Sequence, residues 1–176
     1  MKLYLKSLRE GGNPLSETFP PEQLGLDGEL FTQPVDVAGD VEWNGDNAEV
    51  RLHIVAPVGF LCDRCADEFT LSIETDATVQ ILMKDLPEGD DEDEHEGLIF
   101  AGKQGKLVDL ADEIANAILL SVPLKRLCSE DCKGFCPQCY ANLNQVSCEH
   151  VGLQDQAADE PRGETIADKL AKKQKR

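Results

Sequence analysis

Five of the seven cysteines in this chain lie in one short stretch that ends in a histidine, CSEDCKGFCPQCYANLNQVSCEH, residues 128–150. The other two form a Cys-x2-Cys pair, CDRC, at residues 62–65. A Cys-x2-Cys turn suits zinc because both sulfurs can face one ion, and a structural zinc site takes four thiolate or imidazole ligands. The candidate ligands, enough for one or two structural zinc ions, are Cys62, Cys65, Cys128, Cys132, Cys136, Cys139, Cys148 and His150.

The spacing of these residues allows two ways of sharing ions. In the first, the CDRC and CPQC pairs hold one ion together, and the other four candidates hold a second. In the second, a site is built wholly within residues 128–150, and Cys62 and Cys65 are left as an open thiol pair. The sequence leaves both arrangements open.

Catalysis is the alternative use of these thiols. A thioredoxin-like pair begins a helix in a βαβ unit, whereas CDRCADEFTLSI continues into a strand pattern. A catalytic zinc keeps an open position near a base such as Glu130 or Glu149, but cysteine-rich sites with four ligands are mostly structural. His53 falls on the polar side of its strand and His95 in an acidic run, so we expect neither to have a partner. We therefore predict no catalytic residue, no enzyme and no small-molecule substrate.

The charge and the hydropathy pattern limit the class of protein and its partners. With 34 acidic and 17 basic residues, the formal net charge is −17. This charge opposes broad contact with a phosphate backbone and suits a basic protein partner, although it also serves solubility. No secretory signal and no run approaching the roughly 20 apolar residues of a membrane span is visible. We expect a cytoplasmic protein, in which reducing conditions leave thiols available for metal.

Alternating apolar residues over 35–83 predict the strands that position the CDRC pair. The alternating segments are VDVAGDVEW (35–43), AEVRLHIVAPV (48–58) and FTLSIETDATVQI (69–81). The Asn-Gly turn in NGDN, residues 44–47, predicts a tight hairpin between the first two. Because each strand has one polar face, we expect an antiparallel sheet that is covered on one side. Cys62 and Cys65 then lie in or beside the turn between the second and third strands.

A change of period predicts a single helix. GLIF (97–100) and GKLVDL (105–110) first suggest short strand pieces. Apolar residues then recur every three or four positions over 110–122, with Asp109 placed to cap the helix and Pro123 to end it. Such a stripe is typical of core packing. The predicted fold class is α+β: an antiparallel β-sheet meander with one covering helix and a cysteine-rich zinc-knuckle segment near the C-terminus.

Two polar segments complete the predicted domain organisation. DLPEGDDEDEHE, residues 85–96, carries eight acidic side chains and is predicted to be a solvated loop, either without a partner or docking a basic protein. Residues 1–150 are predicted to form a single α+β domain that includes the cysteine-rich segment. Residues 151–176 are predicted to be a linker followed by a short basic C-terminal helix or tail.

Taken together, these motifs resemble one protein family. LCSEDCKGFCPQCYANLN, residues 127–144, follows a helix pattern that ends in SVPLK, and CDRC and an acidic loop precede it. This order is similar to that of the YceD family, the large ribosomal RNA subunit accumulation proteins. The tail EPRGETIADKLAKK, residues 160–173, is similar to the usual end of the family as well.

The resemblance implies a non-enzymatic role in producing or stabilising the large ribosomal subunit and its RNA. The family's cysteines match all seven cysteines of this chain. Where many members have one more cysteine, this chain has His150, which can also ligate zinc. Where they have Gly after Cys-Pro-x-Cys, it has Tyr140, which is at odds with a tight backbone turn there. Some members lack the C-terminal cluster, so the element they share is either the Cys62–Cys65 pair or lies outside the thiols.

The implied partner is a large-subunit precursor or a basic ribosomal protein, with no membrane contact. The acidic charge favours the protein partner. A local contact with ribosomal RNA would use basic side chains near the cysteine cluster and in the tail: Lys125, Arg126, Lys133, Lys169, Lys172, Lys173, Lys175 and Arg176. The alternatives are a thiol-redox or zinc-dependent enzyme that uses the Cys-x2-Cys pair, and a zinc-stabilised scaffold for an unrelated interaction.

Overall fold

The computed structural model describes residues 1–86, 97–102 and 107–150. The tail predicted at 151–176 and all but the first two residues of the acidic loop predicted at 85–96 lie outside the described residues. The chain divides into two compact units. Unit 1 comprises Met1–Cys62 and Asp67–Cys128, and unit 2 comprises Asp63–Ala66 and Ser129–Arg176. The single domain predicted over 1–150 stays a prediction.

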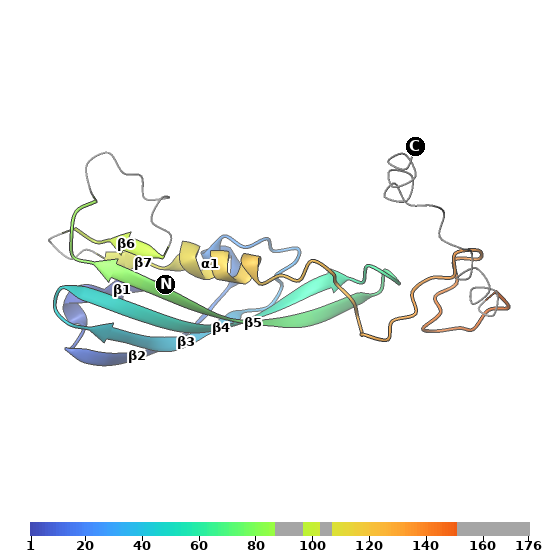
Figure 1. Ribbon diagram of the computed structural model, residues 1–176, viewed down its shortest axis with the longest axis horizontal. Coiled ribbons are helices and arrows are strands. Elements are labelled where there is room, and N and C mark those ends of the chain that lie inside the picture. The colour runs from blue at the N-terminus through green and yellow to red at the C-terminus, as the bar shows by residue number, and fades with distance from the viewer. Residues whose placement is uncertain (87–96, 103–106, 151–176) are drawn as a thin grey trace, which may run out of the picture. The chain divides into compact units, whose positions relative to one another are not determined.

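Unit 1 is built on a five-stranded sheet with the strand order β2-β3-β4-β5-β6 (Figure 1). Its strands are β2 (Gly11–Phe19), β3 (Val35–Trp43), β4 (Asn47–Leu61), β5 (Glu68–Leu82) and β6 (Leu98–Phe100). β2 to β5 form an antiparallel meander, which was predicted for β3, β4 and β5. One edge differs, because β6 pairs with β5 in parallel. The connection from β5 to β6 is long enough for the crossover that a parallel pair needs.

The remaining strands, β1 (Lys2–Tyr4) and β7 (Leu107–Asp109), form a separate antiparallel pair, and two 3-10 helices span Leu5–Ser7 and Pro21–Leu24. β6 and β7 are the short strands predicted in GLIF and GKLVDL. β2 was not predicted, because glycines and a proline interrupt the alternation of GGNPLSETF. It is nonetheless extended, since it pairs with β3 along all nine of its residues. Among the described residues, no helix is long and apolar enough to cross a membrane.

The predicted tight turn joins β3 to β4. The Asn44 side-chain oxygen accepts hydrogen bonds from the backbone N–H groups of Asp46 and Asn47 at 3.2 and 2.8 Å. Farther along the pair, the two strands approach closely at Gly39, where an added Cβ would lie 2.1 Å from the Arg51 carbonyl oxygen. Only glycine fits this position without a shift of the backbone.

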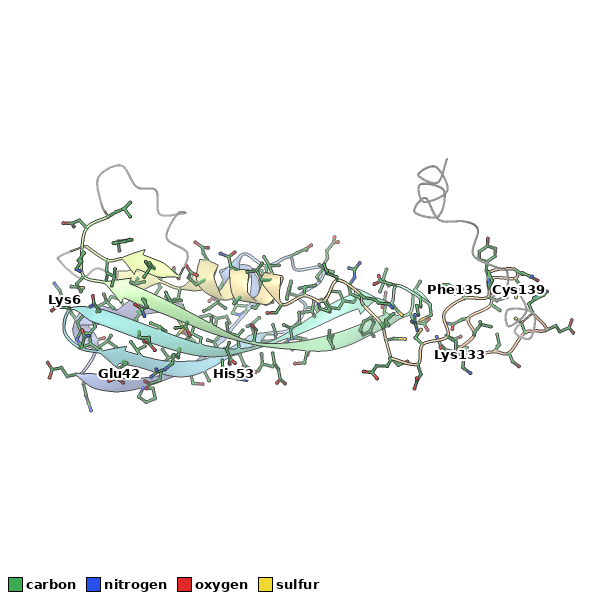
Figure 2. All side chains as sticks on the ribbon, viewed as in Figure 1. Lys6, Glu42, His53, Lys133, Phe135 and Cys139 are labelled. Atoms are coloured by element: carbon green, nitrogen blue, oxygen red, sulfur yellow. The ribbon has the colours of Figure 1, made fainter. Side chains whose placement is uncertain are left out.

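The alternating pattern buries one face of the sheet. Core residues with no exposed surface include Val35, Val41, Val50, Ile54, Ala56, Val58 and Ile81. Glu42 and His53 project from the other face (Figure 2). The expectation that His53 has no partner was wrong: its Nδ1 lies 2.9 Å from Asp76 Oδ1. Asp76 stands directly opposite His53 in the β4–β5 register, and cross-strand neighbours on one face interact. His95 lies outside the described residues.

Helix α1 (Ala111–Leu120) covers the apolar face of the sheet (Figure 1). It buries Ile114 and Ile118 completely, and it is shorter than the 110–122 predicted. The Asp109 carboxylate accepts a hydrogen bond from the Ala111 N–H at 3.1 Å, although the N-cap position belongs to Leu110. Burial raises the pKa of Asp109, but hydrogen bonds from the N-terminal ammonium and Ala111 outweigh it, so the net pKa is lowered.

Candidate metal sites

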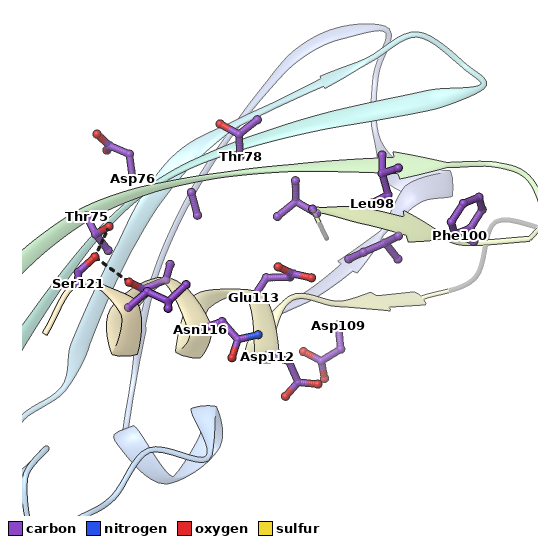
Figure 3. Close-up of a pocket in the computed structure, with 16 residues that line it drawn as sticks. Thr75, Asp76, Thr78, Leu98, Phe100, Asp109, Asp112, Glu113, Asn116 and Ser121 are labelled. Carbon is purple, nitrogen blue, oxygen red and sulfur yellow. Dashed lines mark hydrogen bonds between the residues drawn. The ribbon is translucent and has the colours of Figure 1, made fainter. Parts of the chain in front are cut away.

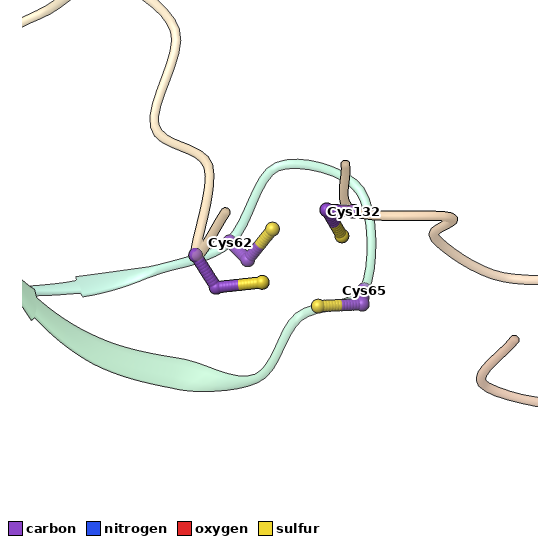
Figure 4. A group of neighbouring side chains, drawn as sticks. Cys62, Cys65 and Cys132 are labelled. Carbon is purple, nitrogen blue, oxygen red and sulfur yellow. The ribbon is translucent and has the colours of Figure 1, made fainter. Parts of the chain in front are cut away.

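The cysteines gather into two groups. In the first, the sulfurs of Cys62, Cys65, Cys128 and Cys132 all lie within 4.8 Å of one another. Figure 4 shows the side chains of Cys62, Cys65 and Cys132 converging, and these three are buried. Four sulfurs around a tetrahedral zinc lie about 3.8 Å apart, because each Zn–S bond is about 2.3 Å long. The group therefore has the composition and spacing that a metal ion requires.

The second group lies within unit 2 and consists of Cys136, Cys139, Cys148 and His150, whose ligand atoms are again within 4.8 Å of one another. His150 Nδ1 is buried and has no hydrogen-bond partner among the residues that the structure describes. A buried polar atom without a partner is costly unless something compensates it, and a neutral imidazole nitrogen is a good zinc ligand. This group therefore also fits a metal ion.

In the second group, the pKa values of Cys136 and Cys148 are shifted in opposite directions. Backbone N–H groups of Cys139 and Gln138 point at the Cys136 sulfur and lower its pKa to about 6, so its thiolate is favoured. Burial raises the pKa of Cys148, although the His150 backbone N–H acts in the other direction. Several thiolates this close repel one another strongly, and a divalent cation removes that repulsion.

Both Cys-x2-Cys turns share an unusual backbone feature. The residue after the second cysteine has a positive φ in each turn: 54° at Ala66 and 56° at Tyr140. These are the two positive-φ residues other than glycine in the described part of the chain. Tyr140 therefore adopts the tight, positive-φ turn for which a glycine would have been expected. Non-glycine residues adopt this conformation at a cost, so the surrounding structure must hold both turns in place.

Within unit 2, Arg64 of the CDRC turn is hydrogen-bonded to the segment Cys132–Phe135. Its guanidinium donates to the Cys132 carbonyl at 2.7 Å, and its own carbonyl accepts from the Phe135 N–H at 3.1 Å. Gly134 makes this approach possible, because its φ is +70° and an added Cβ would lie 2.8 Å from the Arg64 carbonyl oxygen. Arg64 and Gly134 thus fix the ligand-bearing segments, a role that the spacing of the cysteines did not indicate.

Asn144 contacts the candidate ligand Cys132 directly. Its side-chain amide donates to the Cys132 sulfur at 3.3 Å, and its side-chain oxygen accepts from the Lys133 N–H at 2.8 Å. Hydrogen bonds to ligand sulfurs orient them and stabilise the thiolate. Sequence reasoning used the Asn-Leu-Asn segment only as a family signature and missed this contact.

The observed grouping differs from both arrangements considered from sequence. The CDRC pair is joined by Cys128 and Cys132, and the CPQC pair by Cys148 and His150. Each Cys-x2-Cys turn thus belongs to a different group. All eight predicted ligands fall into one of the two groups, and the ligand atoms of each group are close enough together that they could hold a metal ion.

Three of the eight candidate RNA contacts lie in the described part of the chain. Lys125 and Lys133 are exposed, and the Arg126 guanidinium lies over the Phe60 ring, 5.7 Å from its centre. The other five are outside the described residues: Lys169, Lys172, Lys173, Lys175 and Arg176. These contacts stay a prediction.

The fold and the two cysteine groups define a mostly β protein with a zinc-knuckle-like segment in its C-terminal region. The model of one family, described as large ribosomal RNA subunit accumulation protein YceD, matches residues 50–170. This match spans more than half of the 176 residues, so the chain belongs to the YceD family. No curated protein and no solved structure matches the chain.

Proposed function

We propose that this chain is a cytoplasmic factor that supports the accumulation of large-subunit ribosomal RNA without catalysing a reaction. It acts by binding a precursor of the large subunit or one of its basic proteins. The observation that carries this proposal is the family match over residues 50–170, which includes both cysteine groups, α1 and most of the sheet. The fold by itself is compatible with many functions.

The distribution of charge favours a basic protein as the direct partner. The sheet face that α1 leaves uncovered carries acidic side chains on the three adjacent strands β3, β4 and β5. Where these three strands pair side by side, the basic residues on this face are Arg51 and His53. The acidic residues are Asp36, Asp40, Glu42, Glu49, Glu74 and Asp76. Such a face repels phosphates and attracts lysine and arginine side chains.

We infer that both cysteine groups hold structural zinc. Each group offers four thiolate or imidazole ligands, which is the full complement of a closed structural site and leaves no position for a substrate. Arg64 and Asn144 hold the segments that carry these ligands. Zinc would therefore stabilise the fold of the cysteine-rich segments, and no reaction step is assigned to it.

Depletion of the protein from its native cells tests the proposed function. We expect large-subunit ribosomal RNA to fall relative to small-subunit RNA and to recover when the wild-type chain is restored. The tagged full chain should also sediment with large-subunit precursors. An unchanged RNA ratio together with absence from precursor fractions would overturn the proposal.

Elemental analysis of protein purified without added metal tests the zinc assignment. We expect about two zinc ions per chain, falling to about one in Cys65→Ser and in Cys139→Ser, because each substitution removes one ligand from a different group. Ser72→Ala, an exposed position on β5, is the control and should leave the zinc content unchanged. Rapid alkylation of Cys62 and Cys65 in metal-loaded protein would instead favour the thiol-redox alternative.

A further inference from the structure

A groove of about 690 Å³ lies in unit 1 between α1, β5 and β6 (Figure 3). Residues of α1 spaced three or four apart form one wall, including Glu113, Asn116 and Leu120. The opposite wall is Thr75–Val79 of β5, and Leu98–Phe100 of β6 continues it. At the C-terminal end of α1, the Ser121 and Thr75 hydroxyls are hydrogen-bonded at 2.8 Å and join the two walls.

The lining of this groove is acidic. Its charged side chains are those of Asp109, Asp112 and Glu113, and no lysine or arginine occurs among the described residues that line it. Figure 3 shows Glu113 between α1 and β6, with Asp109 and Asp112 close by at the N-terminal end of the helix. Carboxylates lining a groove with partly apolar walls attract cations more strongly than isolated surface carboxylates do.

The groove also carries apolar surface that α1 and the sheet do not bury. Leu98, Ile99 and Phe100 are only half-buried, and Leu120 is 80 % exposed. Exposed apolar side chains grouped beside polar ones mark surfaces that bind other proteins.

One wall of the groove is an open sheet edge. β6 pairs with β5 only over Gln80–Leu82, and no strand in the described part of the chain pairs with that edge of β5 over Glu68–Val79. The backbone N–H and C=O groups on such an edge can pair with an added strand. Addition of an extended peptide to an open edge is a recurring mode of recognition, in which alternate side chains enter the neighbouring groove.

We propose that this groove binds an extended segment of a partner protein in which lysine or arginine side chains alternate with apolar ones. The segment pairs with the open edge of β5, its cations face Asp112 and Glu113, and its apolar side chains pack against Leu98 and Leu120. The identification of that partner as a basic ribosomal protein rests on the proposed function. An RNA occupant is disfavoured, because its phosphates would face the carboxylates.

Binding of a fluorescent synthetic peptide in which Lys and Val alternate, measured by anisotropy with the full chain, tests this proposal. We expect saturable binding that weakens with salt, and roughly tenfold weaker binding by the double variant Asp112→Asn/Glu113→Gln. The control variant Glu10→Gln/Glu29→Gln makes the same charge change at exposed positions outside both the groove and the acidic sheet face, and should bind as the wild type does. Leu120→Ser should weaken binding at every salt concentration, because it removes apolar contact.

Three results would overturn the proposal that the groove binds such a segment. They are no peptide binding to the wild type, equally weakened peptide binding in the control double variant, or displacement of the peptide by an unstructured RNA. Thermal melting of each variant verifies that it is folded. Sedimentation of the wild type with large-subunit precursors separates this proposal from the proposed function. Peptide binding without sedimentation would overturn the ribosomal role and leave the binding role of the groove in place. Sedimentation without peptide binding would overturn only the binding role of the groove.

Discussion

The two units of this chain are stabilised by different means. Unit 1 buries a continuous set of aliphatic and aromatic side chains between its sheet and α1. In the described part of unit 2, every buried side chain is a cysteine: Cys65, Cys132 and Cys136. A segment with so little apolar burial cannot offset the conformational entropy lost on folding, so it requires another source of stability. Metal ligation is the source that its residues offer.

The largest effect is expected from removing the metal. Structural zinc contributes about 10–16 kcal/mol of binding free energy in small zinc-dependent folds, and this free energy is also folding free energy. Treatment with a strong chelator should therefore abolish amide-exchange protection in residues 129–150 and leave that of β3, β4 and β5 in place. Protection that survives chelation in 129–150 would show that unit 2 is stable without metal.

A backbone clash should produce the largest effect in unit 1. Gly39→Val places a side chain where even a Cβ would lie 2.1 Å from the Arg51 carbonyl oxygen, so the sheet must shift. We expect the free energy of unfolding to fall by more than about 3 kcal/mol in urea denaturation. Ala38→Val, at the exposed neighbouring position, is the matched control and should change it by less than about 0.5 kcal/mol.

The corresponding glycine in unit 2 should affect metal binding and not the sheet. Gly134→Ala puts a Cβ 2.8 Å from the Arg64 carbonyl oxygen at a φ of +70°. We expect zinc affinity, measured by competition with a chelating dye, to weaken by about tenfold, which corresponds to about 1.4 kcal/mol. The urea midpoint of the sheet should stay at the wild-type value. A loss of sheet stability as well would mean that the two units fold as one.

A gain is expected from relieving the backbone of the second Cys-x2-Cys turn. Tyr140→Gly relieves a positive φ of 56°, which glycine adopts without cost. We expect zinc affinity to rise by up to about fivefold, or about 1 kcal/mol. Ala141→Gly is the control, since Ala141 has no positive φ and should gain nothing. Weaker binding by Tyr140→Gly would show that the tyrosine ring stabilises the turn.

The smallest signal concerns the CPQC turn without metal. The lowered pKa of Cys136, about 6 against an ordinary value near 9, means that its thiolate favours the folded turn. This stabilisation is complete above pH 9 and is lost as the pH falls through 6. In metal-free, reduced protein, the small fraction of chains that keeps this turn should titrate near pH 6, so the averaged amide resonances of Gln138 and Cys139 should shift slightly as the pH falls from 7 to 5. The shift should vanish in Cys136→Ser, and persistence there would assign it to another group.

Much of unit 1 was predictable because patterns among neighbouring residues specify its strands, its hairpin turn and its helix. Alternation in β3, β4 and β5 predicted the strands, since side chains on a strand face opposite sides in turn. The Asn-Gly turn predicted their hairpin, and the period of three and four predicted α1. β2 escaped prediction because its pairing with β3, and not its own residue pattern, makes it a strand. The direction of β6 escaped for the same reason.

The sequence by itself determined which residues can ligate a metal, because cysteine and histidine chemistry belongs to the residue type. It also determined the net charge of −17. Only the tertiary structure decided that Cys62 and Cys65 share a group with Cys128 and Cys132. The groove between α1 and β5 likewise required it. Both depend on contacts between residues far apart in the chain, and spacing along the sequence does not encode such distances.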